Sequence, residues 1–287
     1  MYDTLDAEIN ALETILRKGS LPDAAVQERL AGIFGRIQEE RRAIDEAYRR
    51  ARSLLLEFLQ AKRGEDSRAA RVDAIVDALA MGDASALRLL ADANDPLAKG
   101  VFLLCHGEMT EAERVLEAMN GAGEGLGRVF LERIKAQKGL LAAGASFDQP
   151  LPEGADGTEM KDAVDAHIRS LSELARTLGT TTSGHLYTRL LVAEALLVAR
   201  RLDAMVVTLM PASRDERLGV VASYLEGKAR YFMGDRAAAR SIWQRIASHT
   251  ENCFARWAAA ATEALAARQI PRLPAITDFG RHGAPQA

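Results

Sequence analysis

Aromatic residues and cysteines are scarce in this sequence, and both shortages restrict the kind of protein it encodes. Phe, Trp and Tyr make up 5% of the 287 residues, whereas aromatic and β-branched side chains normally line the pleats of a β-sandwich. The two cysteines, Cys105 and Cys253, lie far apart in the chain, which argues against a disulfide framework. We therefore expect closely packed helices and two reduced, buried thiols.

An excess of positive charge is also missing, as are long apolar runs. The formal net charge is −3, so the chain lacks the broad basic character of most nucleic-acid-binding proteins. No stretch reaches the roughly 20 apolar residues that span a bilayer. The first residues, Met1 to Asp6, lack the basic start and apolar run of a secretory signal. The sequence predicts a cytoplasmic protein with no nucleic-acid partner and no direct membrane insertion.

One spacing of small and large residues is present twice, and each member of the second copy lies 127 positions after its counterpart. The first glycine and the alanine of the pattern permit a close approach of two helices, the second glycine permits the turn between them, and the large residue fills the seam. The pattern therefore predicts repeated helical hairpins and an all-α fold. The two copies are Gly100, Gly107, Ala112 and Leu116, and then Gly227, Gly234, Ala239 and Trp243.

The second copy resembles the tetratricopeptide repeat, a helical hairpin of about 34 residues. Residues 224–235 are similar to the first helix and turn of that family, and Ala239, Trp243 and the run Ala258–Ala260 are similar to its continuation. The resemblance extends over residues 70–268. It implies a TPR-like α-solenoid, in which the first helices of successive hairpins form a groove that binds a peptide or a helix of another protein.

Breaks in the helical pattern divide the chain into five segments. We predict an N-terminal coiled-coil helical hairpin over 1–66, a first repeat-like segment over 67–145, an exposed loop over 146–159, a second repeat-like segment over 160–269 and a flexible tail over 270–287. The tail contains three prolines and no apolar periodicity, so it is extended unless it docks. A peptide ligand and a linker are both open interpretations of it.

Three residues are the predicted partner-binding set in the groove. Tyr224, Lys228 and Tyr231 are spaced by four and three residues, and we expect them to face away from the packing side that Gly227 marks. Tyrosine suits this role because its rigid ring buries apolar area while its hydroxyl can bond to a partner. The competing interpretation is that one or both tyrosines pack against the neighbouring helix.

A heptad pattern in the N-terminal part predicts an oligomerisation or docking surface. The first helix of the hairpin is too short to cover the whole seam, so the far end of the second helix must pack on the rest of the chain or on another chain. The residues that we assign to this surface are Ile44, Ala51, Leu54 and Phe58.

Catalytic and metal-binding patterns are missing. The histidines show neither a close pair on one helix face nor an HExxH motif, and Cys105 and its neighbour His106 diverge by about 100° on a helix. We therefore predict no metal, no cofactor and no catalytic residue. The histidines considered are His106, His167, His185, His249 and His282.

These observations favour a non-enzymatic adaptor or scaffold that binds another protein in a TPR-like groove. One alternative is a structural assembly subunit that forms homo-oligomers through the N-terminal coiled coil. A second alternative is an enzyme or ligand sensor with a helical pocket, for which a cavity with converging His, Asp or Glu side chains would be the indication.

Overall fold

The described part of the chain is entirely helical. No strand occurs in it, so the predicted all-α class is confirmed there. The chain divides into two compact units, Met1–Ser67 and Arg68–Ala287. None of the described helices is both long and apolar enough to cross a membrane. The computed structural model describes residues 31–33, 35–36, 65–92, 94–119, 125–151, 158–179, 182–248, 255–267 and 273–279.

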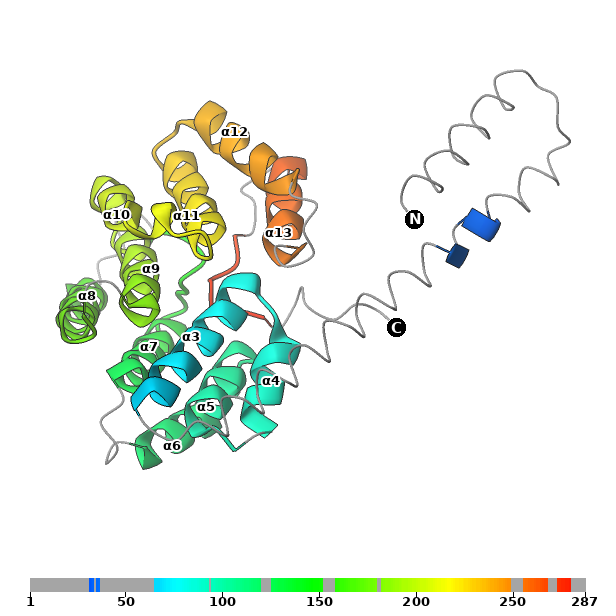
Figure 1. Ribbon diagram of the computed structural model, residues 1–287. Helices are drawn as coiled ribbons and strands as arrows, with labels where there is room; N and C mark the ends of the chain where they lie inside the picture. Colours follow the sequence, from blue (N-terminus) through cyan, green and yellow to red (C-terminus); the bar gives the residue numbers. More distant parts are fainter. Residues whose placement is uncertain are drawn as a thin grey trace, which may run out of the picture. The chain divides into compact units, whose positions relative to one another are not determined.

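The second unit is built from consecutive helices, beginning with α3 at its border (Figure 1). Their bounds are α3 Glu65–Met81, α4 Ala84–Asp92, α5 Pro96–Cys105, α6 Met109–Ala118, α7 Gly125–Ala142, α8 Thr158–Thr177, α9 Ser183–Val198, α10 Leu202–Leu209, the 3-10 turn η1 Ala212–Arg214, α11 Gly219–Phe232, α12 Arg236–Ala247 and α13 Ala255–Ala266.

Each helix from α4 to α13 packs on the next one in the chain. The odd-numbered helices also contact one another, because α5 packs on α7, α7 on α9, α9 on α11 and α11 on α13. They therefore form a continuous row through the second unit. Figure 1 shows residues 273–279, in red, beside this row.

The turns of the two hairpins that carry the repeated pattern have the geometry expected from it. In α5–α6 and α11–α12 the turn glycines Gly107 and Gly234 have φ angles of 82° and 88°, a region that residues with a β-carbon rarely enter. The side chains of Asp95 and Asp235 accept hydrogen bonds from the backbone N–H three residues on and so cap α5 and α12. Short-range chemistry therefore sets where these helices begin and turn.

The first glycine of each copy lies where two helices meet most closely. A β-carbon on Gly100 would lie 2.5 Å from Cγ of Leu116, and one on Gly227 would overlap the indole of Trp243. Real β-carbons do not approach heavy atoms so closely, so neither hairpin could close in this way around an alanine. The predicted pairing of a small residue on the first helix with a large one on the second is confirmed in both hairpins.

The predicted exposed loop over 146–159 is wrong for part of its length. Residues up to Leu151 are non-helical, but Phe147 and Pro150 are buried. The reason is a tertiary contact, since the guanidinium carbon of Arg133 lies 3.4 Å from the centre of the Phe147 ring. The remainder of the loop up to α8 is not described.

Several predictions concern residues outside the described part. The coiled-coil hairpin over 1–66 falls almost wholly there, as does the thiol of Cys253. These stay predictions. The same holds for the oligomerisation set Ile44, Ala51, Leu54 and Phe58.

The close approach in the second hairpin can be tested by adding one methyl group. We expect Gly227→Ala to lower the free energy of unfolding by about 1–3 kcal/mol, because the rigid indole of Trp243 must move. The matched control is Gly139→Ala, since Gly139 lies inside α7 with no neighbour within 4 Å of an added β-carbon. The control should be neutral or stabilise by about 0.5–1 kcal/mol. Urea denaturation measures both, and equal effects would contradict the packing role.

Candidate functional site

Residues 273–279, called here the C-terminal segment, lie buried against the odd-numbered helices. Every one of the seven except Asp278 is buried, and Ile276 is 0% exposed. The prediction of a flexible tail is therefore wrong for these residues. The physical reason is a set of buried charged side chains, described next, that bind the backbone of the segment.

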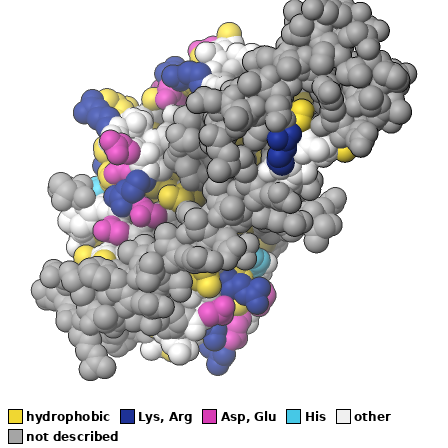
Figure 2. Space-filling view, turned by 45° about the vertical axis from the view of Figure 1, so that its right-hand side comes forward, with side chains coloured by type: hydrophobic (Ala, Val, Ile, Leu, Met, Phe, Trp, Pro, Cys, Tyr) yellow, Lys and Arg dark blue, Asp and Glu magenta, His cyan; other side chains and the backbone are white. Residues whose placement is uncertain are grey.

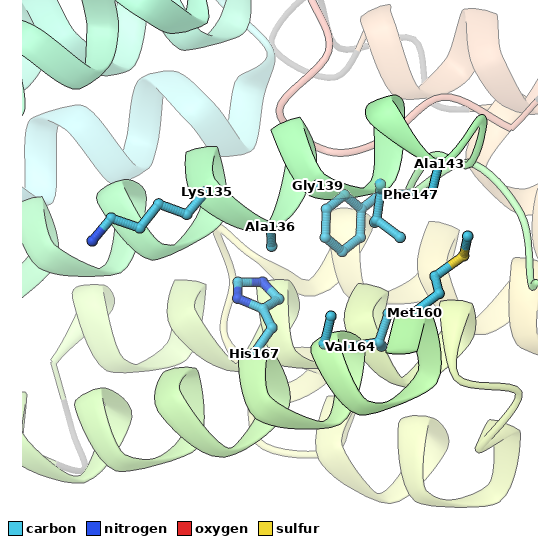
Figure 3. Close-up of a pocket in the computed structure, with 10 residues that line it drawn as sticks. Lys135, Ala136, Gly139, Ala143, Phe147, Met160, Val164 and His167 are labelled. Carbon is cyan, nitrogen blue, oxygen red and sulfur yellow. The ribbon is translucent and has the colours of Figure 1, made fainter. Parts of the chain in front are cut away.

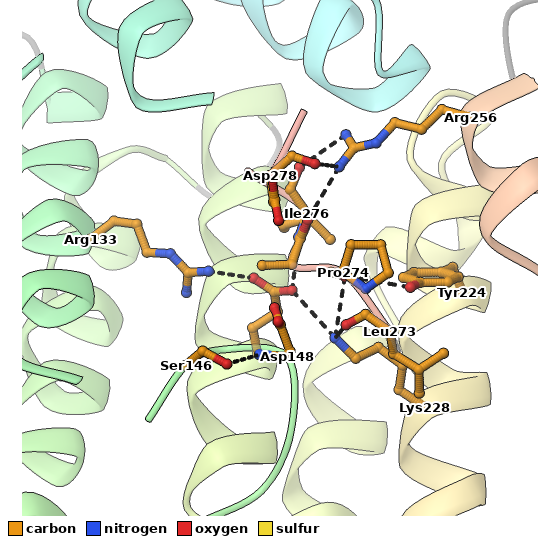
Figure 4. A network of polar contacts seen from close by, with 12 residues as sticks. Arg133, Ser146, Asp148, Tyr224, Lys228, Arg256, Leu273, Pro274, Ile276 and Asp278 are labelled. Atoms are coloured by element: carbon orange, nitrogen blue, oxygen red, sulfur yellow. Dashed lines mark hydrogen bonds and ion pairs between the residues drawn. The ribbon is translucent and has the colours of Figure 1, made fainter. Parts of the chain in front are cut away.

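Glu194 of α9 is the centre of this set. Figure 4 shows its partners Arg133, Lys228 and Ile276 around one carboxylate. The Oε2 of Glu194 accepts a hydrogen bond from Nη2 of Arg133 in α7 at 2.7 Å, and its Oε1 accepts one from the backbone N–H of Ile276 at 2.9 Å. The Nζ of Lys228 in α11 lies 3.8 Å from the same Oε1. All three charged side chains are 0% exposed. One carboxylate therefore joins three helices and the C-terminal segment.

Lys228 and Tyr224 of α11 hold the beginning of the segment. The Nζ of Lys228 donates to the carbonyl of Leu273 at 3.1 Å and to that of Pro274 at 3.4 Å. The hydroxyl of Tyr224 donates to the Pro274 carbonyl at 3.4 Å. Two of the three residues predicted to bind a partner therefore contact an extended stretch of this chain itself.

Arg256 of α13 holds the rest of the segment. Its guanidinium donates to the carbonyls of Ala275 at 3.2 Å, Ile276 at 3.3 Å and Asp278 at 2.6 Å. The guanidinium carbon also lies 4.1 Å from the centre of the Phe279 ring, within cation–π range. Arg256 thus binds both the backbone and the aromatic end of the segment.

The far end of the segment is fixed on α5. The backbone N–H of Phe279 donates to the carbonyl of Cys105 at 2.9 Å, which satisfies one of the free carbonyls at the end of that helix. The Cys105 thiol is buried, and burial raises its pKa to about 12. It is therefore a protonated packing residue, as predicted, and its neighbour His106 is exposed.

Three cations and three carboxylates act on one another at this site, since Asp148 acts on Arg133 and Lys228, and Asp278 on Arg256, besides Glu194. Among these carboxylates, that of Glu194 is fully buried. Burial lowers the pKa of each of the three cations, while Glu194 acts in the opposite direction on Arg133 and Lys228. Five carbonyls of the segment accept hydrogen bonds from Lys228 and Arg256, so the segment stabilises these two cations where water is excluded.

Tyr231, the third predicted groove residue, is not part of this site. Its ring packs on Trp243 of α12, with 5.8 Å between centroids, and lies perpendicular to the ring of Phe232. The expectation that it faces away from the side of Gly227 is wrong. Residues four apart lie on the same helix face, so Tyr231 shares the face of Gly227 and packs on α12.

A second concave region lies between α7 and α8 (Figure 3). It has a volume of about 370 Å³ and is mainly apolar, with His167 as its buried polar group. Burial, and then the charge of Arg133, lower the pKa of His167 to about 3, and its Nε2 has no hydrogen-bond partner. No carboxylate occurs among the described lining residues, so they provide no acid–base pair. These are Lys135, Ala136, Gly139, Leu140, Ala143, Phe147, Met160, Ala163, Val164 and His167.

The charged residues Arg133, Glu194 and Arg256 were not identified from the sequence. Glu194 could have been identified, because it is the single charged residue in the apolar run 190–198 of α9. An acidic residue inside such a run is normally paired with a buried cation. Nothing in the sequence shows that its partners come from α7 and α11. In the described residues no group of three His, Cys, Asp or Glu side chains could hold a metal ion.

Comparisons with protein-family models, with curated proteins and with solved structures gave no match.

The central carboxylate can be tested by an isosteric substitution. We expect Glu194→Gln to lower the free energy of unfolding by about 3–5 kcal/mol, because it removes the buried carboxylate that pairs directly with Arg133 and Lys228. The matched control is Glu226→Gln, which removes the partly exposed ion pair with Arg230 and should cost less than about 1 kcal/mol. Urea denaturation measures both, and similar losses would contradict the central role of Glu194.

The buried histidine predicts a dependence of stability on pH. Because the pKa of His167 is about 3 in the folded chain and 6.5 ordinarily, the unfolded chain takes up a proton below pH 6.5 while the folded chain does not. Stability is therefore lost as pH falls from 6.5 towards 3. Between pH 7 and 5 the free energy of unfolding of the wild-type chain should fall by about 2 kcal/mol more than that of the His167→Gln variant. Urea denaturation at each pH measures both proteins. Parallel profiles of the free energy of unfolding against pH would show that His167 does not contribute to the pH dependence.

Proposed function

We propose that this chain is a non-enzymatic adaptor that captures an extended segment of a partner protein at the site lined by Glu194, Tyr224, Lys228 and Arg256. The observation that carries the proposal is the C-terminal segment itself. Lys228 and Arg256 donate hydrogen bonds to five of its backbone carbonyls. Every peptide has such carbonyls, so a segment of another protein can occupy the same donors.

The architecture supports the same proposal. Repeated hairpins with a continuous row of first helices are the arrangement that the resemblance to the tetratricopeptide repeat implies, and in that family the row lines the peptide groove. Here the contacting side chains come from α9, α11 and α13. In this proposal the second unit is a TPR-like solenoid, and the C-terminal segment occupies its groove.

Surface charge favours a protein partner over a nucleic acid. On the face seen in Figure 2, Lys and Arg side chains lie beside Asp and Glu side chains. Nucleic-acid binding normally requires a clustered basic face. Exposed pairs such as Arg201 and Asp165, 2.7 Å apart, show the same mixing.

The proposal requires that the C-terminal segment can be exchanged for another peptide. The test starts from the folded full-length chain with a specific protease site introduced between Arg268 and Arg272. After cleavage, a fluorescent peptide of residues 270–287 is added in excess. We expect it to bind one to one, because cleavage turns an intramolecular contact, with an effective concentration on the order of millimolar, into a bimolecular one.

Two controls define the site. The uncleaved chain should bind the labelled peptide at least about 100-fold more weakly, since its own segment competes intramolecularly. Lys228→Met should weaken binding to the cleaved chain, whereas Tyr231→Phe should not, because Tyr231 packs on α12. A cleaved chain that takes up no labelled peptide would rule out the adaptor function at this site.

A further inference from the structure

We infer that the partner segment has the spacing of Leu273, Pro274, Ile276 and Phe279, namely apolar, proline, any residue, apolar, any two residues, aromatic, and that it carries no positive charge between the first and the last of these positions. This inference rests on the proposed function, because it assumes that a partner binds where the C-terminal segment lies. It goes further by naming the chemistry of the partner.

The two ends of the pattern are apolar anchors. Leu273 and Phe279 are 1% and 5% exposed, and burial of such side chains supplies most of the binding free energy in a peptide complex. The Phe279 ring also lies on the guanidinium of Arg256. An aromatic side chain gains this cation–π contact at the last position and an aliphatic one does not.

Proline is suited to the second position by its chemistry. All the hydrogen bonds described at Pro274 go to its carbonyl, from Tyr224 and Lys228. Proline has no backbone N–H to leave unpaired, and its fixed φ lowers the entropy lost when an extended segment is ordered.

The fourth position has the opposite requirement. The backbone N–H of Ile276 donates to Oε1 of Glu194 at 2.9 Å, in a fully buried setting. A proline there would remove this donor from a buried carboxylate, which is costly because the lost hydrogen bond cannot be replaced by water. The site therefore distinguishes a proline at the second position from one at the fourth.

The charge of the site disfavours a basic residue between the two anchors of the segment. Arg133, Lys228 and Arg256 are buried at this site, and Asp278, the one charged residue of the C-terminal segment, is acidic and acts electrostatically on Arg256. A lysine or arginine near Asp278 would add a further cation next to Arg256, whose Nη2 donates to the Asp278 carbonyl. Like charges in a desolvated site repel strongly, so the segment must be neutral or acidic there.

Competition experiments on the cleaved full-length chain test this pattern. Unlabelled variants of the 270–287 peptide compete with the labelled peptide, so no variant affects the folding of the protein. We expect Phe279→Ala and Ile276→Pro each to weaken competition at least about 10-fold. Ile276→Val is the matched control and should stay within about 10-fold of the parent. Asp278→Lys should compete at least about 10-fold more weakly than Asp278→Asn.

The outcomes separate the two proposals. If the labelled peptide binds but all variants, and a scrambled peptide, compete equally well, the sequence pattern is wrong while peptide capture stands. If Ile276→Pro binds as well as Ile276→Val, the role of the Glu194 hydrogen bond is wrong. If no labelled peptide binds, both the pattern and the proposed function are overturned.

Discussion

A buried carboxylate between two buried cations is the constraint on which this structure depends. Glu194 is fully enclosed, and its two oxygens bind Arg133, Lys228 and the backbone of Ile276. A desolvated charge is tolerated only when it is paired and hydrogen-bonded. Because the partners come from α7, α11 and the C-terminal segment, this single residue requires that three distant parts of the chain meet.

The same constraint explains why the C-terminal segment docks. Lys228 and Arg256 are buried in the row of odd-numbered helices, and buried donors need hydrogen-bond acceptors. The carbonyls of Leu273 to Ile276 and of Asp278 accept from Lys228 and Arg256. A surface of this kind attracts extended backbone, and this property connects the stability of the fold with the proposed capture of a partner.

Part of the fold could be predicted from local sequence patterns. The spacing of Gly100 and Leu116, repeated at Gly227 and Trp243, predicted two hairpins that pack through a glycine, and the structure contains both. Local chemistry suffices here because a turn glycine, a capping aspartate and an i, i+4 face act within a few residues. The prediction that Tyr231 faces away from Gly227 was wrong, although the same geometry predicts the opposite. Tyr231 lies four residues, about one turn, after Gly227 and therefore on the same helix face, which packs on α12.

The sequence alone therefore determined the helical class and the close-packed hairpins, because both depend on interactions between residues that are close together along the chain. Only the tertiary structure decided that Lys228 and Tyr224 face residues 273–279 and that Phe147 lies on Arg133. The pairing of Glu194 with both Arg133 and Lys228 was likewise decided there. The contact between Glu194 and Ile276, for example, joins residues 82 positions apart. Such contacts arise from the burial of charge in a shared interior, which no pattern within a single helix specifies.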